Sequence, residues 1–286
     1  GAGKTLVALR LIYAFDHRTL ILVHSRELMK QWRDAIKTTF GIDPGMVGGS
    51  FKENWDDVTI ASVQTIASRV KRGKIDTIDL NYPVLCADEC HHLPSEDTYT
   101  VAMLYNSPVR FGLSATPYRV DGREMKIWGA IGDICARITP VDLIRRGYLT
   151  EPRFVILDPP YIKMRRTKDW QDAYYDGIVA NQYRNQMIVD TARELMRDGH
   201  KVYIHVERVE HGEILAIMFD DVPFIHGSSP KKERDEVIRK FAGTELNCLI
   251  STLLGEGVDI PAMSAIIMAG GLKTPVGVIQ KVGRAL

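Results

Sequence analysis

The chain has 286 residues, 45% of them hydrophobic, which is enough for two domains that each bury a full-sized core. Its 37 Lys and Arg nearly balance its 36 Asp and Glu, and the net charge of +1 excludes a global basic field that would by itself indicate a nucleic-acid partner. The sequence contains no signal peptide and no run of about 18 apolar residues that would predict a membrane span. Its 4 cysteines form no C-x-x-C pair, which is typical of reduced thiols, so we expect an intracellular protein.

The chain begins with Gly1-Ala2-Gly3-Lys4-Thr5, and the apolar stretch from Leu6 to Ala14 predicts a buried helix directly after it. This pattern is the second half of a G-x-x-x-x-G-K-[ST] phosphate loop, whose backbone N–H groups and helix dipole hold phosphates. Lys4 would reach the β- and γ-phosphates of ATP, and the Thr5 hydroxyl would bind Mg²⁺. The alternative is an ordinary glycine-rich helix cap. Because the first glycine of the loop would precede residue 1, we expect the sequence to be part of a longer protein.

Two adjacent carboxylates, Asp88 and Glu89, end a short buried strand that begins at Pro83. Ligands of open α/β sheets bind at the carboxyl ends of the strands, so acids placed there would meet a metal–phosphate ligand. The neighbouring side chains could also be considered as a zinc site: Cys86, Cys90, His91 and His92. Side chains on a strand-to-loop path need not converge, however, and the metal we expect is magnesium.

Strands alternate with helices through the first half of the chain. Besides the strand that leads to the acids, strands are predicted over 19–23, 58–62 and 110–117, helices over about 26–40 and 95–105, and a turn-rich loop over 41–49. The last of these strands ends in Ser114 and Thr116 and is stopped by Pro117. This alternation is typical of a doubly wound parallel α/β sheet, which we expect to form a first domain over residues 1–149.

The second half repeats this alternation. A compact helix is predicted over 139–147, with Thr139 as its cap, and a strand over 151–157. We expect residues 150–183 to connect two domains and residues 184–286 to form the second. Its predicted helices lie at about 185–197, 207–219, 230–241 and from 274 onward, and its strands at 201–206, 222–226, 246–251 and 264–268. Two similar lobes with a single phosphate loop imply a ligand held between them.

Two local patterns leave alternatives open. Ser25 is a suitable N-cap for the helix that follows, with Leu28 as its third residue, while Arg26 at the same strand end could contact a nucleic-acid phosphate. The basic run from Arg69 to Lys74 favours a solvated helix end over a binding patch.

Taken in order and spacing, the motifs resemble those of the superfamily 2 helicases, which have two RecA-like lobes with the P-loop NTPase fold. The matching segments are 1–5 for motif I, 24–28 for Ia, 88–91 for motif II in its D-E-x-H form, 114–117 for III, 203–206 for IV, 251–259 for V and 280–284 for VI. The D-E-C-H sequence, together with the segment from Gly112 to Arg119, is most similar to the XPB/UvsW-like DNA repair and recombination group.

The resemblance implies an ATP-dependent helicase or translocase, a monomeric motor that acts on DNA rather than RNA and uses Mg-ATP. Lys4, Thr5 and Asp88 would hold ATP and Mg²⁺, and Glu89 would orient and deprotonate the attacking water. The residues implied to link nucleotide state to nucleic-acid binding are His91, Ser114 and Thr116. Those implied to reach the nucleotide from the second lobe are Gly257, Asp259, Gln280 and Arg284, with Arg284 placing positive charge on the γ-phosphate.

Nucleic acid would cross both lobes through contacts to its backbone, which are independent of base sequence. The residues implied are Ser25, Arg26, Gln64, Thr65, His205, Ser251 and Thr252. For most of these hydroxyls a turn or cap hydrogen bond is the alternative.

Motif VI departs from the family pattern, because a second arginine would follow the last residue, Leu286. An arginine finger can be worth roughly 10³–10⁵ in rate, so we expect the segment as given to hydrolyse ATP slowly. Two other functions stay open: a nucleotide-gated clamp that binds nucleic acid without turnover, and the motor segment of a restriction enzyme.

Overall fold

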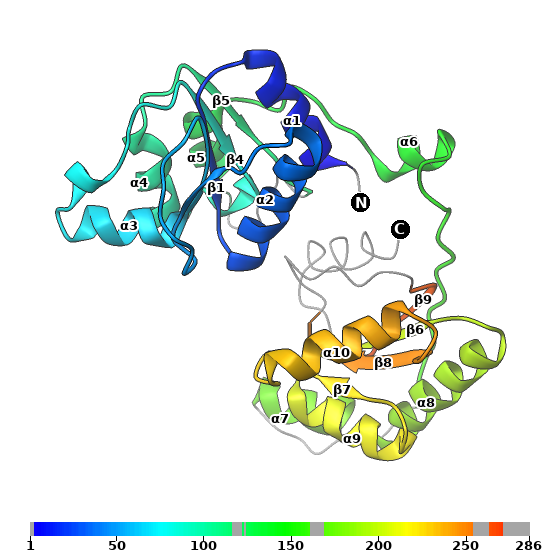
Figure 1. Ribbon diagram of the computed structural model, residues 1–286. Helices are drawn as coiled ribbons and strands as arrows, with labels where there is room; N and C mark the ends of the chain where they lie inside the picture. Colours follow the sequence, from blue (N-terminus) through cyan, green and yellow to red (C-terminus); the bar gives the residue numbers. More distant parts are fainter. Residues whose placement is uncertain (1–2, 116–121, 123, 161–168, 254–262, 271–286) are drawn as a thin grey trace. The chain divides into compact units, whose positions relative to one another are not determined.

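The chain forms two compact units, residues 1–148 and 149–286, each built as an α/β lobe around its own parallel sheet (Figure 1). The structure is a computed structural model that describes residues 3–115, 122, 124–160, 169–253 and 263–270. Over these ranges, no helix combines the length and the apolar character that crossing a membrane requires.

Within its described residues, the first lobe has a parallel sheet of five strands in the order β2-β3-β1-β4-β5. The strands are β1 (Thr19–Val23), β2 (Gly45–Val47), β3 (Val58–Ser62), β4 (Val84–Ala87) and β5 (Val109–Gly112). The helices are α1 (Lys4–Phe15), α2 (Arg26–Phe40), α3 (Val63–Lys71), α4 (Glu96–Leu104), α5 (Glu124–Ile131) and α6 (Pro140–Arg145), with 3-10 turns η1 (Ile75–Thr77) and η2 (Cys90–His92).

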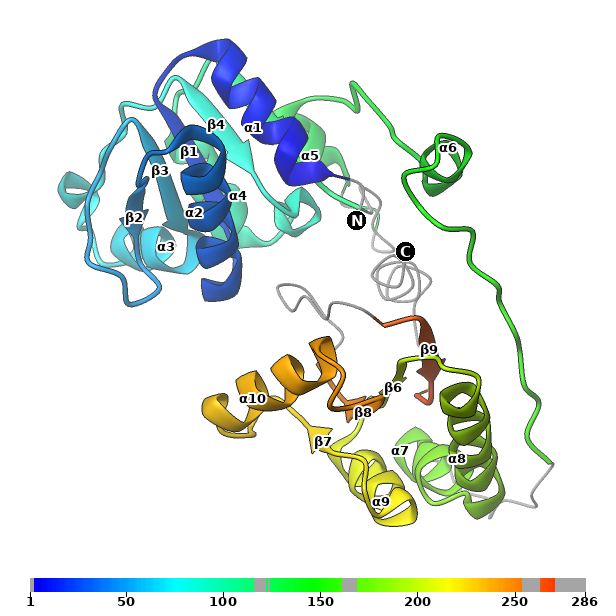
Figure 2. The same ribbon diagram turned by 45° about the vertical axis from the view of Figure 1, so that its right-hand side comes forward.

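The residues of β1 alternate between two cores because successive side chains of a strand point to opposite faces of the sheet. Leu20 and Leu22 pack with α3, α4 and α5, whereas Ile21 and Val23 pack with α1 and α2. Helices therefore cover both faces of the sheet, as Figure 2 also shows. A strand buried on both faces needs apolar residues at every position, which explains the continuous apolar runs in the sequence.

The loop predicted over 41–49 is wrong in part, because it contains the edge strand β2. This strand pairs in parallel with β3, and Gly45 faces Thr59 in the register. A Cβ at Gly45 would lie 2.4 Å from Oγ1 of Thr59, so the close approach of the two strands requires glycine here. The glycines in this segment predicted a loop. One of them, Gly45, instead lies in a strand, where it allows β2 to approach β3 closely.

Helix α1 is present where the sequence predicted it, but its predicted burial is wrong. The buried side chains are Ala8, Leu9 and Ile12, which lie on one face, while Leu6 and Tyr13 are each 67% exposed. An apolar sequence makes burial possible on any side, and only the side that packs against the sheet and α2 is covered.

The described sheet of the second lobe has four parallel strands in the order β7-β8-β6-β9. They are β6 (Val202–His205), β7 (Phe224–Ile225), β8 (Cys248–Ser251) and β9 (Ala265–Met268), and the helices are α7 (Trp170–Tyr174), α8 (Gln182–Arg197), α9 (Val209–Phe219) and α10 (Lys231–Ala242). Val202 and Ile204 pack with α8 and α9, whereas Tyr203 packs with α10 on the other face. The second lobe thus repeats the layered plan of the first.

In the segment from residue 139 to residue 157, the predicted helix is present and the predicted strand is not. The helix predicted over 139–147 is confirmed as α6, with a capping box in which Thr139 and Asp142 bond to each other's backbone N–H groups. The strand predicted over 151–157 is wrong: this stretch has no secondary structure, and Phe154 and Ile156 are 69% and 89% exposed. Its residues have high strand propensity, but no neighbouring strand pairs with them in the described part of the chain.

Residues 170–179, within the stretch predicted to connect the domains, are helical. Helix α7 continues into a π-helix, η3 (Tyr175–Val179), which buries Tyr174 and Val179. The side-chain amide of Asn185 on α8 donates to the carbonyl of Val179 at 2.8 Å, so this part of the segment packs onto the second lobe.

Candidate functional site

The two acids predicted from the sequence lie at the carboxyl edge of the first sheet, directly after β4. Strand β4 is flanked by β1 and β5, and backbone hydrogen bonds fix the path of the chain where it leaves the sheet. The N–H of Asp88 donates to the carbonyl of Leu22 at 3.0 Å, and the N–H of Cys90 donates to the carbonyl of Leu113 at 2.8 Å. The acids are therefore held in place by the strands on both sides.

Lys4 forms an ion pair with Glu89 across this edge. Its Nζ lies 2.7 Å from Oε1 of Glu89, and the two side chains are 29% and 15% exposed. Lys4 is the first residue of α1, and the preceding Gly3 has a left-handed backbone with φ of 69°. That conformation carries almost no steric cost for glycine, so the sequence Gly-Lys lets the chain turn into the helix with the lysine aimed at the acids.

Glu89 adopts a backbone conformation that is unusual for its residue type. Its φ of 47° is in the left-handed region, which typically costs about 1–3 kcal/mol outside glycine and persists where the surroundings enforce it. Here Lys4 pairs with one oxygen of the carboxylate, and Nδ1 of His91 lies 3.3 Å from the other. Burial raises the pKa of Glu89, but His91 and Lys4 outweigh it and leave the pKa below its usual value, so the group stays ionised.

His91 connects Glu89 to the next strand end. Its Nδ1 also lies 3.0 Å from Oγ of Ser114, which follows β5. The structure therefore joins four predicted site residues, Lys4, Glu89, His91 and Ser114, into one continuous chain of polar contacts. No local sequence pattern specifies this connection; it arises because β4 and β5 are neighbours in the sheet.

Asp88 is almost completely buried, and both of its oxygens accept hydrogen bonds. The backbone N–H of Glu89 donates to Oδ1 at 2.9 Å, and the indole N–H of Trp32 donates to Oδ2 at 2.8 Å. Burial raises the pKa of Asp88, and the bond from Trp32 acts in the opposite direction. Trp32 was not predicted as a site residue, since its spacing with Leu28 on α2 is typical of a core stripe.

A row of histidine rings runs from the acids to a pocket. The rings of His91 and His92 have centroids 4.2 Å apart, and those of His92 and His24 are 4.6 Å apart. His24 follows β1, and its carbonyl accepts a hydrogen bond of 2.9 Å from the side-chain amide of Gln64. The predicted nucleic-acid contact at Gln64 is thus linked to the acid cluster through ring contacts that the sequence did not predict.

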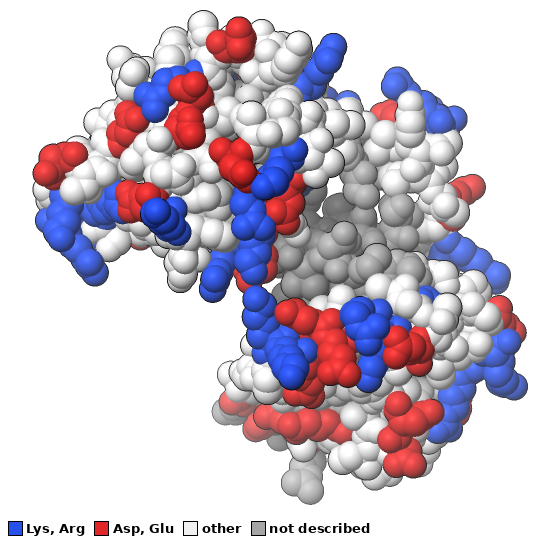
Figure 3. Space-filling model, viewed as in Figure 1, with Lys and Arg blue, Asp and Glu red and all other residues white. Residues whose placement is uncertain are grey.

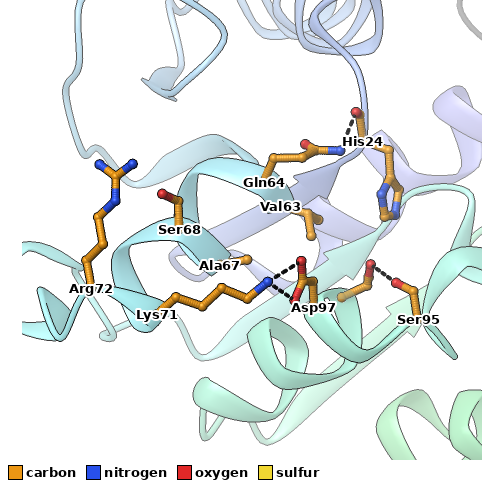
Figure 4. A pocket seen from close by; sticks show the side chains of 10 residues that line it. His24, Val63, Gln64, Ala67, Ser68, Lys71, Arg72, Ser95 and Asp97 are labelled. Carbon is orange, nitrogen blue, oxygen red and sulfur yellow. Dashed lines mark hydrogen bonds and ion pairs between the residues drawn. The ribbon is translucent and has the colours of Figure 1, made fainter.

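The pocket, with a volume of about 550 Å³, lies between the length of α3 and the first turn of α4 (Figure 4). It is lined by His24, Val63, Gln64, Ala67, Ser68, Lys71, Arg72, Ser95, Asp97 and Thr98. In Figure 4 the ammonium group of Lys71 points at the carboxylate of Asp97, with which it forms an ion pair of 2.6 Å. In the basic run, Arg69 is also paired, with Glu53, so two of its cations serve ion pairs within the lobe.

The other predicted nucleic-acid residues of the first lobe have structural contacts of their own. Ser25 caps α2, since its Oγ accepts a hydrogen bond of 3.1 Å from the N–H of Leu28. Arg26 is exposed, with its guanidinium 5.8 Å from the centroid of the Phe51 ring. Thr65 is half-buried on α3. The cap predicted for Ser25 is confirmed.

The nucleic-acid residues predicted in the second lobe, all of them described, lie at one sheet edge. His205 ends β6 and Ser251 ends β8, and the two face each other in the strand register. His205 is buried, with Nε2 3.4 Å from Oε1 of Glu207. Oγ of Ser251 accepts a hydrogen bond of 2.9 Å from the N–H of Leu253, and the half-buried Thr252 follows it.

Several predicted residues lie outside the described ranges. They are Gly1, Ala2, Thr116, Gly257, Asp259, Gln280 and Arg284. Thr5 is described and is exposed in the first turn of α1, next to Lys4.

The cysteines near the acids lie on opposite sides of the sheet. Cys86 belongs to the core beneath α1 and α2, and Cys90 to the core beneath α3, α4 and α5. Across the described ranges, no group of three or more His, Cys, Asp or Glu side chains is placed to hold a metal ion. Asp88 would therefore need oxygen atoms from other sources, such as a hydroxyl and phosphates, to complete a metal site.

The charges of both lobes are mixed over the face seen in Figure 3, where Lys and Arg side chains are interspersed with Asp and Glu. This agrees with the balanced composition of the chain.

Comparisons with known proteins agree with these features. Residues 1–119 match the family described as type III restriction enzyme, res subunit, and residues 185–286 match the helicase conserved C-terminal domain. The DNA 3′-5′ translocase XPB2 of Sulfurisphaera tokodaii is 26% identical over 100% of this chain and 73% of its own length. A Rad25 protein of Halobacterium salinarum is 29% identical over 95% of this chain, which spans only 45% of that protein.

Among solved structures, the Pyrococcus furiosus Hef helicase domain superposes with a TM-score of 0.62 at 16% identity, over 99% of this chain and 88% of that one. At this level of identity the likeness concerns the fold alone. Together with the two parallel sheets, it confirms the predicted pair of RecA-like lobes in tandem.

Proposed function

Because the chain belongs to the superfamily 2 helicases and is related to XPB, we propose that it hydrolyses ATP to drive movement along DNA. The observation that carries this proposal is the continuous contact from Lys4 through Glu89 and His91 to Ser114. It places a phosphate-binding cation, an ionised carboxylate and a group on the next strand end within one cluster. Such a cluster suits hydrolysis that must respond to a second ligand.

The residues present fit a magnesium nucleotide. Each oxygen of Asp88 accepts one hydrogen bond and keeps a second lone pair, and Thr5 offers a hydroxyl in the first turn of α1. Mg²⁺ prefers such oxygen ligands and, when bound, would neutralise charge on the phosphates. Asp88 and Thr5 are therefore the residues that we propose hold it.

Lys4 and Glu89 would separate when nucleotide binds. In the described arrangement, the ammonium group of Lys4 is paired with Glu89 at 2.7 Å. The β- and γ-phosphates would compete for that ammonium group, since they carry more negative charge than one carboxylate. Glu89, released from Lys4 and still held by His91, could then accept a proton from the attacking water.

We propose that the second lobe completes the site through Gly257, Asp259, Gln280 and Arg284, as the family resemblance implies. An arginine that approaches from a separate lobe makes charge neutralisation depend on domain closure. Nucleic acid would contact the strand ends of both lobes through Ser25, Arg26, Gln64, Thr65, His205, Ser251 and Thr252. We place such a DNA motor inside the cell and expect it to act as a monomer.

The test is the substitution Glu89→Gln, assayed for ATP hydrolysis with single-stranded DNA, duplex DNA and RNA of equal length. We expect wild-type hydrolysis to rise with DNA, and the variant to lose roughly 10²–10⁴-fold in rate because it lacks the general base. Nucleotide binding should persist. Glu96→Gln, which changes an exposed acid at the start of α4, is the matched control and should keep full activity. Wild-type rates in the Glu89 variant would refute this mechanism.

A second candidate is the motor segment of a restriction-type enzyme, which the family match over residues 1–119 favours. The hydrolytic chemistry of the described residues would be the same. The two functions differ in their product: a restriction enzyme cleaves DNA when supplied with its nuclease, so DNA cleavage by the whole protein would favour this candidate.

A further inference from the structure

We infer that Trp32 is a positioning residue for the metal-holding carboxylate of Asp88. This inference rests on the proposed function, since it assigns to Trp32 a part in holding the metal of that same site. The indole N–H lies 2.8 Å from Oδ2 of Asp88, although the two residues are 56 positions apart in the chain. A hydrogen bond to an ionised group is typically worth more than one between neutral groups.

The geometry leaves the carboxylate little freedom. Trp32 is 1% exposed and packed in the core beneath α1 and α2, so its ring has a fixed orientation. The other oxygen, Oδ1, accepts from the backbone N–H of Glu89 at 2.9 Å. With one donor on each oxygen, the carboxylate is restrained in one orientation, which sets the direction of its remaining lone pairs. Partners of this kind orient metal ligands in many sites.

The bond also connects Asp88 to the helix that carries candidate nucleic-acid contacts. Helix α2 begins at Arg26 and presents Trp32 about two turns later on its buried face. The chemistry of the indole suits this role, because its N–H can only donate and therefore pairs with a carboxylate oxygen.

The test compares the binding of a non-hydrolysable ATP analogue, AMP-PNP, in Mg²⁺ and in EDTA. In the wild type, Mg²⁺ should strengthen binding. In Trp32→Phe, which keeps an aromatic ring but lacks the N–H, we expect the Mg²⁺-dependent gain in affinity to fall roughly 10–100-fold, the usual loss for such a partner. Affinity in EDTA should stay the same.

Trp55→Phe is the matched control, because Trp55 packs against Tyr82 in the same lobe and is not bonded to Asp88. Its Mg²⁺-dependent gain should equal that of the wild type. A general loss of stability in Trp32→Phe would lower affinity in EDTA as well, so the ratio of the two affinities isolates the positioning role. An unchanged ratio in folded Trp32→Phe would overturn the inference, whereas no nucleotide binding by the wild type would instead refute the proposed function.

If Trp32→Phe does not fold, Trp32 itself can serve as the probe. When Trp55, Trp128 and Trp170 are each replaced by Phe, Trp32 is the one tryptophan left in the sequence. We expect its fluorescence to change when Mg²⁺ is added to the AMP-PNP complex, since the metal would bind the carboxylate that accepts its N–H. Identical emission in Mg²⁺ and in EDTA, with AMP-PNP bound, would overturn the inference.

Discussion

At the residue scale, the site depends on side chains that share one another's contacts. Glu89 is held by both Lys4 and His91, and His91 is held by both Glu89 and Ser114. A change at Ser114 therefore acts on the link to the neighbouring strand end while it leaves the Glu89 pair with Lys4 in place. This separation allows coupling to be tested apart from hydrolysis.

We predict that Ser114→Ala keeps basal ATP hydrolysis within about twofold but lowers DNA-stimulated hydrolysis roughly fivefold, the equivalent of one hydrogen bond of about 1 kcal/mol. Rates with and without DNA measure this. Ser107→Ala is the control. This substitution also removes a buried hydrogen bond, from the Ser107 hydroxyl to the carbonyl of Tyr82, but on a segment away from the acids. Equal losses in basal and stimulated rate for Ser114→Ala would contradict a coupling role.

At the element scale, Ser25 has a structural role that is separable from its proposed contact with nucleic acid. Its Oγ caps α2 by accepting from the N–H of Leu28 at 3.1 Å. We predict that Ser25→Ala lowers the free energy of unfolding by about 1 kcal/mol, whereas Ser25→Asn, which also caps well, restores most of it. Urea denaturation checks both values. DNA affinity in the Asn variant then reports the second role, because the cap is retained while the hydroxyl is gone.

The packing of α8 on α9 makes a second element-scale prediction, on pH. His211 of α9 is fully buried, and its Nε2 donates to Oδ1 of Asn185 on α8 at 2.9 Å. Burial lowers the pKa of His211 to about 4, and the nearby Arg184 acts in the same direction. The usual pKa of histidine is about 6.5, so between these values the unfolded chain takes up a proton that the folded chain does not.

The contribution of the neutral His211 to the free energy of unfolding is therefore fully present above about pH 6.5. It is lost as the pH falls toward 4, by about 3 kcal/mol in total. We predict that His211→Gln, which keeps an N–H donor but does not titrate, flattens the dependence of the unfolding free energy on pH in this window. Denaturant titrations at several pH values measure it, with the exposed His17→Gln as control. Parallel pH curves for wild type and His211→Gln would show that another group is responsible.

At the scale of the whole molecule, each lobe has its own cores. The segment that follows α6 has no regular secondary structure and exposes apolar side chains. Residues 149–160 contain neither helix nor strand, and Phe154 is 69% exposed. Such segments are preferred sites of proteolysis. We predict that limited chymotrypsin treatment cuts after Phe154 and leaves two resistant fragments, identified by mass spectrometry. Phe241, which is fully buried, is the internal control, and earlier cleavage inside either sheet would contradict the prediction.

Much of the fold could be predicted from the sequence, because apolar runs and helix caps depend on neighbouring residues. The strands β1, β3 and β4 and the capped helix α6 were predicted for this reason. The edge strand β2 and the absence of a strand over 151–157 were not, because a strand forms only where another strand pairs with it.

The sequence by itself determined the chemistry of the site: a lysine after glycines, and two acids where a buried strand ends. Only the tertiary structure decided which groups touch them. The order of the strands brings Ser114 to His91, and the packing of α2 on the sheet brings Trp32 to Asp88. Contacts between residues tens of positions apart depend on how elements pack, and packing is a property of the whole lobe that no local pattern records.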